Sequence, residues 1–328
     1  MADKHLILVH GRATKPPKAA KRRLVKKALV EGLKRVDTKA AHAVASGRVK
    51  FTLAYYGDIN NRLMIAAEPE RKGEMVEIGD DWYEPPHSYD EDLDRLLRRP
   101  TSRHSLRDYK RLLREVDDQR FKDDIARIAS PILNLFGLGT KIIQKTLPDL
   151  GAYMTSRVVG SEIRNRLQSP IKRALKSGQQ VAIIAHSMGC IVSYDVLWKL
   201  SRMSEYEDVR DRKVSLWLTL GSPLGEPAVQ AALYDAHEPD DGMYPTNISR
   251  WVNIAARDDF VAHDASVADD FKQMRRRGLI HRIRDLPRIN SFWVGTNGSN
   301  PHKFYGYLNH PRVARIVAEW LNCSAPPP

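Results

Sequence analysis

The chain has 328 residues, of which 42% are hydrophobic and 28% are charged. This length and composition exclude a disordered chain and fit one large domain, or a core with an inserted subdomain. No apolar run approaches the roughly 18 residues of a membrane span, and the apolar run at 6–9 is too short for a signal-peptide core. We therefore expect a cytoplasmic protein. Two cysteines, Cys190 and Cys323, do not make a disulfide framework.

The formal net charge is +13, from 53 basic and 40 acidic side chains. The basic residues cluster at 15–27, 95–114 and 275–284. One interpretation is attraction to an anionic surface, either lipid headgroups, nucleic acid or an acidic substrate. The other is solvated helix faces, which the acidic residues mixed into the second cluster favour. No nucleic-acid-binding motif accompanies the charge, so nucleic acid is not favoured as a partner, and peripheral contact with an anionic membrane stays an alternative.

The first elements predicted along the chain alternate between strand and helix. Residues 5–9 predict a buried strand that ends at His10 and Gly11, residues 18–36 a helix, and residues 49–55 a second strand. Residues 58–156 then contain many charges and no clear strand, with candidate helices at 89–98 and 105–114. We interpret residues 59–156 as an inserted, mainly helical cap.

Regular alternation resumes after this segment. The predicted elements are a helix over 158–176, a strand over 181–185, a helix over 191–203, strands over 214–220, 251–255 and 291–294, a closing helix over 313–321, and a flexible tail over 323–328. Strands separated by helices predict a doubly wound, mostly parallel α/β sheet whose core comprises residues 1–58 and 157–322. Ligands bind such a sheet at the carboxyl ends of its strands.

The most informative segment is Val181 to Val192, where an apolar run ends in a corner with Ser187 at its tip. The corner matches the nucleophile elbow, G-x-S-x-G, with Ala185 in the first glycine position and Gly189 in the last. A sharp, strained turn requires small flanking residues. The alternative is an ordinary strand-to-helix corner with an inert serine. Cys190 follows on the same helix, and we expect it to serve packing.

A serine nucleophile needs a general base, and the base needs an orienting carboxylate. Asp258 and Asp259 both follow the strand predicted at 251–255. We choose Asp259 because the apolar pair that follows it can hold a carboxylate inward, and we keep Asp258 as the runner-up acid. The alternative is a solvated Asp-Asp turn.

Four histidines follow the acid, namely His263, His281, His302 and His310. We choose His302 as the base because it lies in the loop between the last predicted strand and the last helix. His310 is the runner-up, but it precedes a proline and opens the final helix, which is typical of a capping residue. His263 follows Asp259 too closely to turn back onto the site.

The negative charge that develops on a substrate oxygen needs preorganised N–H donors. Met188 follows the serine and can supply one backbone N–H. The loop after the first strand supplies the second from Arg12, since Gly11 after His10 allows a close backbone approach. The alternative for His10 and Gly11 is a plain strand-end turn. No metal site is evident in the sequence, and we predict no cofactor.

These segments together resemble the α/β-hydrolase superfamily of serine esterases and lipases. The matching pieces are Leu6 to Gly11, Ala185 to Gly189, Leu220 to Pro223, Asp258 to Val261, and His302 in its late loop. The A-H-S-M-G corner is similar to that of bacterial lipases. The resemblance implies Ser187 as nucleophile, Asp259 as acid, His302 as base, and an oxyanion hole from Arg12 and Met188. Because the chain starts directly at the His-Gly strand, it also implies a reduced sheet of about six strands.

The function that follows is hydrolysis of small-molecule or lipid acyl esters through an acyl-enzyme. The alternatives are a thioesterase, amidase or acyltransferase on the same triad, and a non-catalytic binding protein of the same fold. The sequence pattern indicates no particular oligomeric state.

Overall fold

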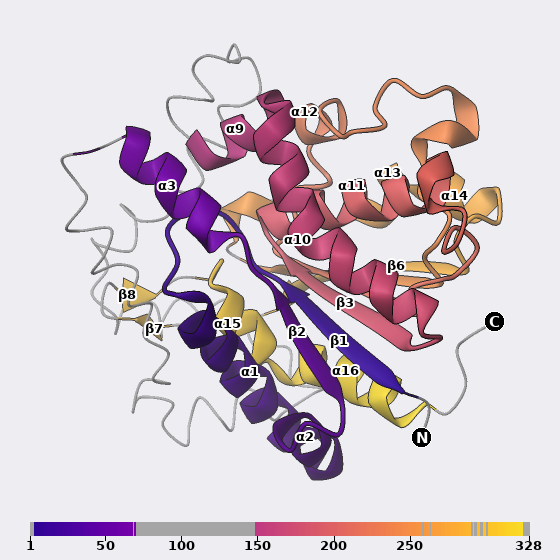
Figure 1. Ribbon diagram of the computed structural model, residues 1–328. Helices are drawn as coiled ribbons and strands as arrows, with labels where there is room; N and C mark the ends of the chain where they lie inside the picture. The colour runs from indigo at the N-terminus through magenta and orange to yellow at the C-terminus, as the bar shows by residue number, and fades with distance from the viewer. Residues whose placement is uncertain are drawn as a thin grey trace.

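Six parallel strands form the centre of the molecule (Figure 1). The computed structural model describes residues 3–67, 69, 148–257, 259–262, 264–289, 291, 294–295, 298–299 and 301–323. In sheet order the strands are β2 (Lys50–Ala54), β1 (Lys4–Val9), β3 (Gln180–His186), β4 (Leu216–Leu220), β5 (Arg250–Ala256) and β6 (Arg282–Ile289). With helices on both faces, the predicted α/β architecture around a parallel sheet is confirmed.

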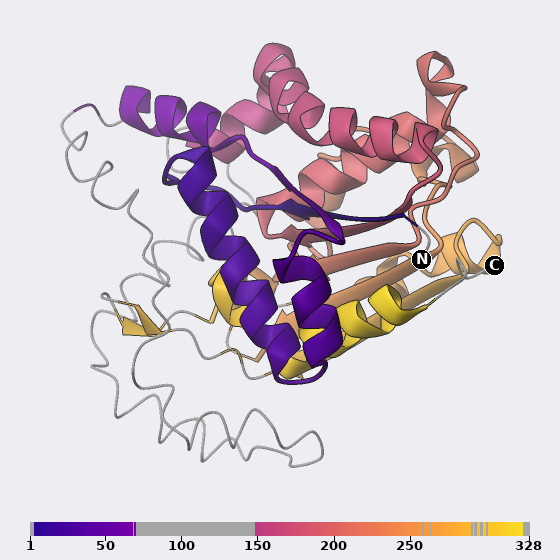
Figure 2. The same cartoon turned by 60° about the horizontal axis from the view of Figure 1, so that its bottom comes forward.

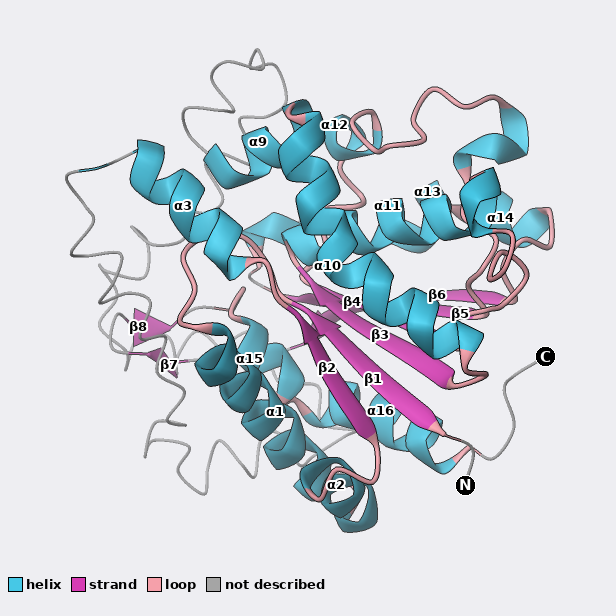
Figure 3. Ribbon diagram, in the orientation of Figure 1, coloured by secondary structure: helices cyan, strands magenta, loops and turns pink. Residues whose placement is uncertain are grey.

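Helices cover the two faces of the sheet in separate layers (Figure 3). One face carries α1 (Lys18–Lys34), α2 (Thr38–Ala45), α15 (Phe304–Leu308) and α16 (Pro311–Asn322). The other carries α3 (Gly57–Ala67), α9 (Pro148–Thr155), α10 (Arg157–Lys176), α11 (Met188–Arg202), α12 (Pro227–Gln230), α13 (Val267–Asp270) and α14 (Lys272–Arg276). Short 3-10 turns lie at Ser204–Tyr206, Asp240–Met243 and Phe260–Ala262. Each layer therefore has its own apolar core against the sheet.

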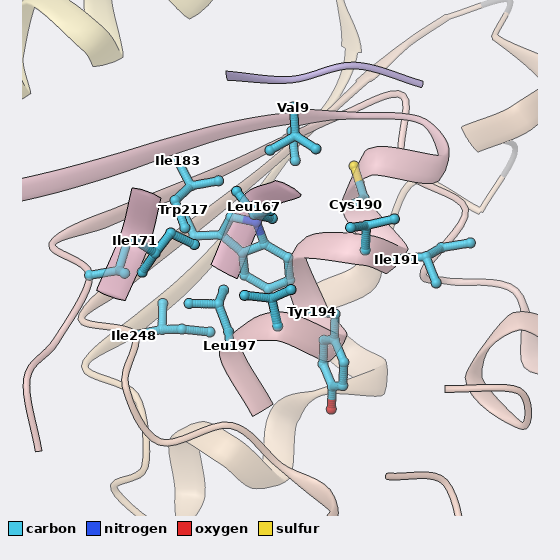
Figure 4. Packing of buried hydrophobic residues seen from close by; sticks show 14 of the residues in the cluster. Val9, Leu167, Ile171, Ile183, Cys190, Ile191, Tyr194, Leu197, Trp217 and Ile248 are labelled. Atoms are coloured by element: carbon cyan, nitrogen blue, oxygen red, sulfur yellow. The ribbon is translucent and has the colours of Figure 1, made fainter. Parts of the chain in front are cut away.

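The core beneath α10 and α11 is built from aromatic and branched side chains (Figure 4). The Trp217 ring stacks on Trp251 of the neighbouring strand with a centroid distance of 4.2 Å. Ile171 of α10 and Leu197 of α11 belong to the same core cluster and lie near Trp217 in Figure 4. Strands buried on both faces need continuous apolar runs, and this is why β1, β3 and β4 were recognisable in the sequence.

The register of the strands brings their carboxyl ends together. Val9 at the end of β1 pairs with Ala185 of β3, and His186 at the end of β3 pairs with Leu220 of β4. The chain segments that follow these three strands therefore start side by side at one edge of the sheet, where ligands bind in such folds.

The sixth strand lies elsewhere than the sequence pattern predicted. We expected the last strand at 291–294, but the sheet ends with β6 at Arg282–Ile289, which pairs parallel to β5. Residues Val294–Gly295 instead form β7, which pairs antiparallel with β8 (Gly298–Ser299). As an edge strand β6 carries three arginines and Pro287, so it lacks the apolar run that identifies a buried strand.

The structure describes the two ends of the segment predicted as a cap. Helix α3 begins at Gly57 and helix α9 ends at Thr155, and both contribute to the core through Ile59, Leu150 and Tyr153. The candidate helices at 89–98 and 105–114 lie outside the described residues, as do residues 324–328 of the predicted tail.

Among the helices that the structure describes, none is both long enough and apolar enough to cross a membrane.

Candidate active site

Ser187 forms the corner between β3 and α11 in a strained backbone conformation. Its φ and ψ angles are 55° and −129°, a region that residues with a side chain rarely adopt. The corner is fixed from both sides, because the Ser187 N–H donates to the Leu220 carbonyl at 3.1 Å and its carbonyl accepts from the Cys190 N–H at 2.8 Å. The surrounding structure thus holds the serine at the tip of the turn.

Two glycines allow the corner to pack against the end of β1. A Cβ at Gly189 would lie 2.7 Å from the His10 carbonyl oxygen. A Cβ at Gly11 would lie 2.8 Å from the Cβ of Ser187 and 3.3 Å from its hydroxyl oxygen. Both positions therefore require glycine because of close approach, and Gly11 leaves the space directly beside the serine hydroxyl.

The structure brings Asp259 and His302 into hydrogen-bond contact. His302 Nδ1 lies 2.9 Å from Asp259 Oδ1 and 2.8 Å from Oδ2. Asp259 follows the end of β5, and His302 precedes α15. The carboxylate also accepts hydrogen bonds from the Tyr307 hydroxyl at 2.6 Å and from the Val261 N–H at 3.0 Å. Four contacts hold the two carboxylate oxygens, so the acid has one orientation.

The environment of Asp259 favours its ionised form. Burial alone would raise the pKa of this carboxyl, but His302, the Tyr307 hydroxyl and the Val261 N–H outweigh burial and hold the pKa below its ordinary value. An ionised carboxylate only accepts hydrogen bonds, so Nδ1 of His302 must be the donor. In the neutral imidazole the basic lone pair is then on Nε2, as a general base requires.

Gly221 was not assigned a role from the sequence, although it provides the room for this pair. It follows β4 with a φ of 54°, and a Cβ there would lie 2.7 Å from Asp259 Oδ2 and 3.0 Å from His302 Nδ1. The sequence did contain a signal for this role, because Gly221 directly follows β4, the strand next to the one that carries Ser187. Tyr307 of α15 also binds Asp259 directly through its hydroxyl group.

Two further histidines hold the loops around Ser187. His186 Nε2 donates to the His302 carbonyl at 2.6 Å, and its ring stacks on Phe304. His10 accepts the Tyr56 N–H on Nε2 at 3.1 Å, so its Nδ1 is the donor to the Gly11 carbonyl at 2.8 Å. Burial is the largest cause that holds the pKa of both imidazoles well below the usual value. Both rings are therefore neutral, and they position the backbone.

The loop after β1 is fixed by Asp149, which sequence reasoning missed because it lay in the predicted cap. Its carboxylate pairs with the Arg12 guanidinium at 3.1 Å and accepts a hydrogen bond from the Ala13 N–H at 2.5 Å. The Lys15 ammonium donates to the carbonyls of residues 12, 13 and 14. These contacts hold the loop that carries the proposed Arg12 donor.

Ser187 and His302 line one cavity of about 130 Å³. The other described residues that line it are His10, Gly11, Arg12, Ala13, Lys15, Lys21, His186, Lys303 and Phe304. Met188 is the first residue of α11, where backbone N–H groups have no intrahelical acceptor.

The structure does not place the other candidate residues in the Ser187 cavity. His310 caps α16, since its Nδ1 accepts the Arg312 N–H at 3.1 Å, and it is not among the described residues that line the cavity. Asp258 and His263 lie outside the described residues. Within the described residues no three His, Cys, Asp or Glu side chains are grouped in a way that could hold a metal ion.

Comparison of the chain with protein-family models, with curated proteins and with solved structures finds no match. The residues around Ser187 are therefore the basis for assigning a function.

Proposed function

We propose that the protein is a serine hydrolase of the α/β-hydrolase type that cleaves carboxylic acyl esters through an acyl-enzyme. One observation carries the proposal: a serine in a strained strand-to-helix corner shares a cavity with a histidine that a buried carboxylate orients. A serine hydroxyl is a poor nucleophile at neutral pH, and a histidine with its Nδ1–H on a carboxylate is the group that activates it.

Acylation begins when the Ser187 hydroxyl oxygen attacks the ester carbonyl carbon. Nε2 of His302 takes the hydroxyl proton, and ionised Asp259 stabilises the imidazolium that forms. The backbone N–H groups of Met188 and Arg12 donate to the tetrahedral oxyanion. His302 then returns the proton to the leaving alcohol as the carbon–oxygen bond breaks, which leaves an ester on Ser187.

Deacylation repeats these steps with water as the nucleophile. His302 takes a proton from water, the hydroxide attacks the acyl-enzyme, and the proton passes to the oxygen of Ser187. The carboxylic acid is released, and the site returns to its starting state. Gly11 keeps the space beside the serine hydroxyl open for both attacks.

Hydrolysis of p-nitrophenyl acetate, butyrate and laurate tests the proposal, together with labelling by a fluorophosphonate. We expect the wild type to hydrolyse at least one ester and to be labelled. Ser187→Ala should lose labelling and at least about a thousandfold in kcat, as expected for a triad nucleophile. The matched control is Ser193→Ala, which removes another buried serine from α11.

Absence of both hydrolysis and labelling in the folded wild type would reject the proposal. Equal labelling of the wild type and Ser187→Ala would reject Ser187 as the nucleophile. The chain-length profile of the active protein would show how long an acyl group the cavity admits.

A further inference from the structure

Four of the eleven described residues that line the Ser187 cavity have cationic side chains. Its described lining includes Arg12, Lys15, Lys21 and Lys303, and it includes no carboxylate. Two of the cations, Lys15 and Lys21, come from the start of the chain, and Lys303 follows the proposed base directly. A site that held only a neutral acyl chain would have no need for four cations around it.

Lys21 lies in α1, and Lys303 directly precedes α15. Helices α1 and α15 lie side by side (Figure 2). Lys21 is only 2% exposed, and its ammonium donates to the Tyr305 hydroxyl at 2.5 Å and lies 4.2 Å from the centre of that ring. The Lys303 ammonium lies 5.9 Å from the same ring centre. Tyr305 thus holds two positive charges at one side of the cavity.

The other two cations are held by the loop after β1. Arg12 is paired with Asp149, and Lys15 donates to three carbonyls of its own loop. These contacts keep the charged ends of both side chains close to the backbone that lines the cavity.

The charges of Lys15 and Lys21 act on His186. His186 lies directly before the nucleophile and lines the cavity. Burial is the main cause that lowers the pKa of His186, His302 contributes next, and Lys15 and Lys21 lower it further by charge repulsion. The positive charges of Lys15 and Lys21 therefore act at His186, the residue that precedes Ser187.

We propose that the natural ester carries a second, anionic group, an oxyanion such as a carboxylate or phosphate, close to the bond that is cleaved. This inference rests on the proposed function, because Ser187 defines where the ester lies. Narrow clefts lined by charges of one sign attract oppositely charged ligands and raise their association rates. Ammonium and guanidinium groups are also the usual partners of carboxylates and phosphates.

Two p-nitrophenyl esters of equal acyl length test the inference, namely the neutral butyrate and the anionic hemisuccinate. We expect the hemisuccinate to have a kcat/KM at least about tenfold higher at low salt. Lys303→Gln should reduce the ratio of the two kcat/KM values by about tenfold. The matched control is Lys176→Gln, which removes an exposed lysine of α10 that pairs with Asp208 and should leave the ratio unchanged. A ratio of one or less in the wild type, or an equal ratio in Lys303→Gln, would overturn the inference.

Inhibition of butyrate hydrolysis by inorganic phosphate and by acetate identifies the kind of oxyanion. Competitive inhibition by either anion, beyond that of chloride at equal ionic strength, supports the inference, and the lower inhibition constant names the preferred group. No difference between these anions and chloride contradicts it.

Binding to Ser187→Ala separates the two proposals. Succinamate and butyramide are anionic and neutral analogues of the two acyl groups, and their dissociation constants can be measured by NMR titration. We expect succinamate to bind at least about tenfold more tightly. This preference without hydrolysis of either ester would reject the hydrolase and retain the anion site. Hydrolysis of both esters with equal kcat/KM would reject the anion site and retain the hydrolase.

Discussion

Gly221 lies so close to Asp259 that a methyl group on the glycine would stand 2.7 Å from the carboxylate Oδ2. The same methyl group would lie 3.0 Å from His302 Nδ1. Strands β4 and β5 are neighbours in the sheet, so the loop after one meets the residues after the other. The room available to the proposed acid and base is therefore set by a residue that takes no part in the chemistry.

Gly221→Ala should separate Asp259 and His302 and lower kcat/KM by at least about a hundredfold, the scale expected for a displacement of about 1 Å. Ester hydrolysis measures this directly, and circular dichroism establishes that the variant is folded. The residue has a φ of 54°, so alanine also introduces backbone strain.

Gly178→Ala is the matched control for this strain. Gly178 has a φ of 69°, and a Cβ there would have no atom within 4 Å. The control should lose stability to a similar small extent, about 1 kcal/mol, and keep its activity. Equal activities in the two variants would contradict the role of Gly221.

Tyr307→Phe should reduce kcat by about tenfold with little change in KM. The hydroxyl donates to Asp259 Oδ2 at 2.6 Å and accepts the Ala256 N–H at 2.8 Å. Its removal takes one of four contacts from the carboxylate and leaves a buried N–H unpaired. Loss of the donor should also raise the pKa of Asp259.

Tyr153→Phe serves as the control for Tyr307. It removes a buried hydroxyl that donates to Asp195, a carboxylate outside the described lining of the Ser187 cavity. Both variants should lose about 1–3 kcal/mol of unfolding free energy in urea titrations. An equal fall of kcat in both would show that Tyr307 acts through stability alone.

The sequence predicted those parts of the structure that have a local signal. The buried strands were visible as apolar runs, and Ser187 was visible because a strained corner needs small neighbours on both sides. The edge strand β6 was missed, since its arginines resemble those of a solvated loop. The short helices α2 and α15 were missed as well, and neither has the length that makes helical periodicity clear.

Contacts between distant residues account for the rest of the site. The order of Asp259 and His302 after Ser187 indicated their roles, but Asp149 is 137 positions from the Arg12 that it binds. Gly221 and Asp259 meet only because β4 and β5 are adjacent. Local patterns contain no signal for such contacts, and the topology of the sheet is needed to bring them together.

The two cysteines should differ sharply in reactivity. Cys190 is fully buried, and burial is the main cause that raises the pKa of its thiol to about 12. Because the thiolate is the reactive form, iodoacetamide at pH 8 should label one thiol per native chain, at exposed Cys323, and two in urea. Cys323→Ser should abolish native labelling. Rapid labelling of native Cys190 would contradict the packing role that its position predicts.

Two buried acids, Asp195 and Asp235, should make a contribution to the stability of the protein that falls as pH rises from about 4 to about 7. Burial is the largest cause that raises the pKa of Asp195 to about 6 and that of Asp235 to about 7. Both values lie above those of the unfolded chain, so the folded chain binds more protons in this window. Rising pH then favours unfolding until both acids are ionised.

In Asp235→Asn the side chain has nearly the shape of the protonated acid but cannot ionise. Relative to the wild type, the variant should gain in Tm as the pH rises from 5 to 8, and it should have the higher Tm at pH 8. The contrasting control is Asp208→Asn, because a hydrogen bond from Lys176 lowers the pKa of this exposed acid. Its ionised form is the favoured one in the fold, so its replacement should give no gain at pH 8. A difference in Tm between Asp235→Asn and the wild type that is the same at pH 5 and at pH 8 would show that Asp235 does not titrate in this range.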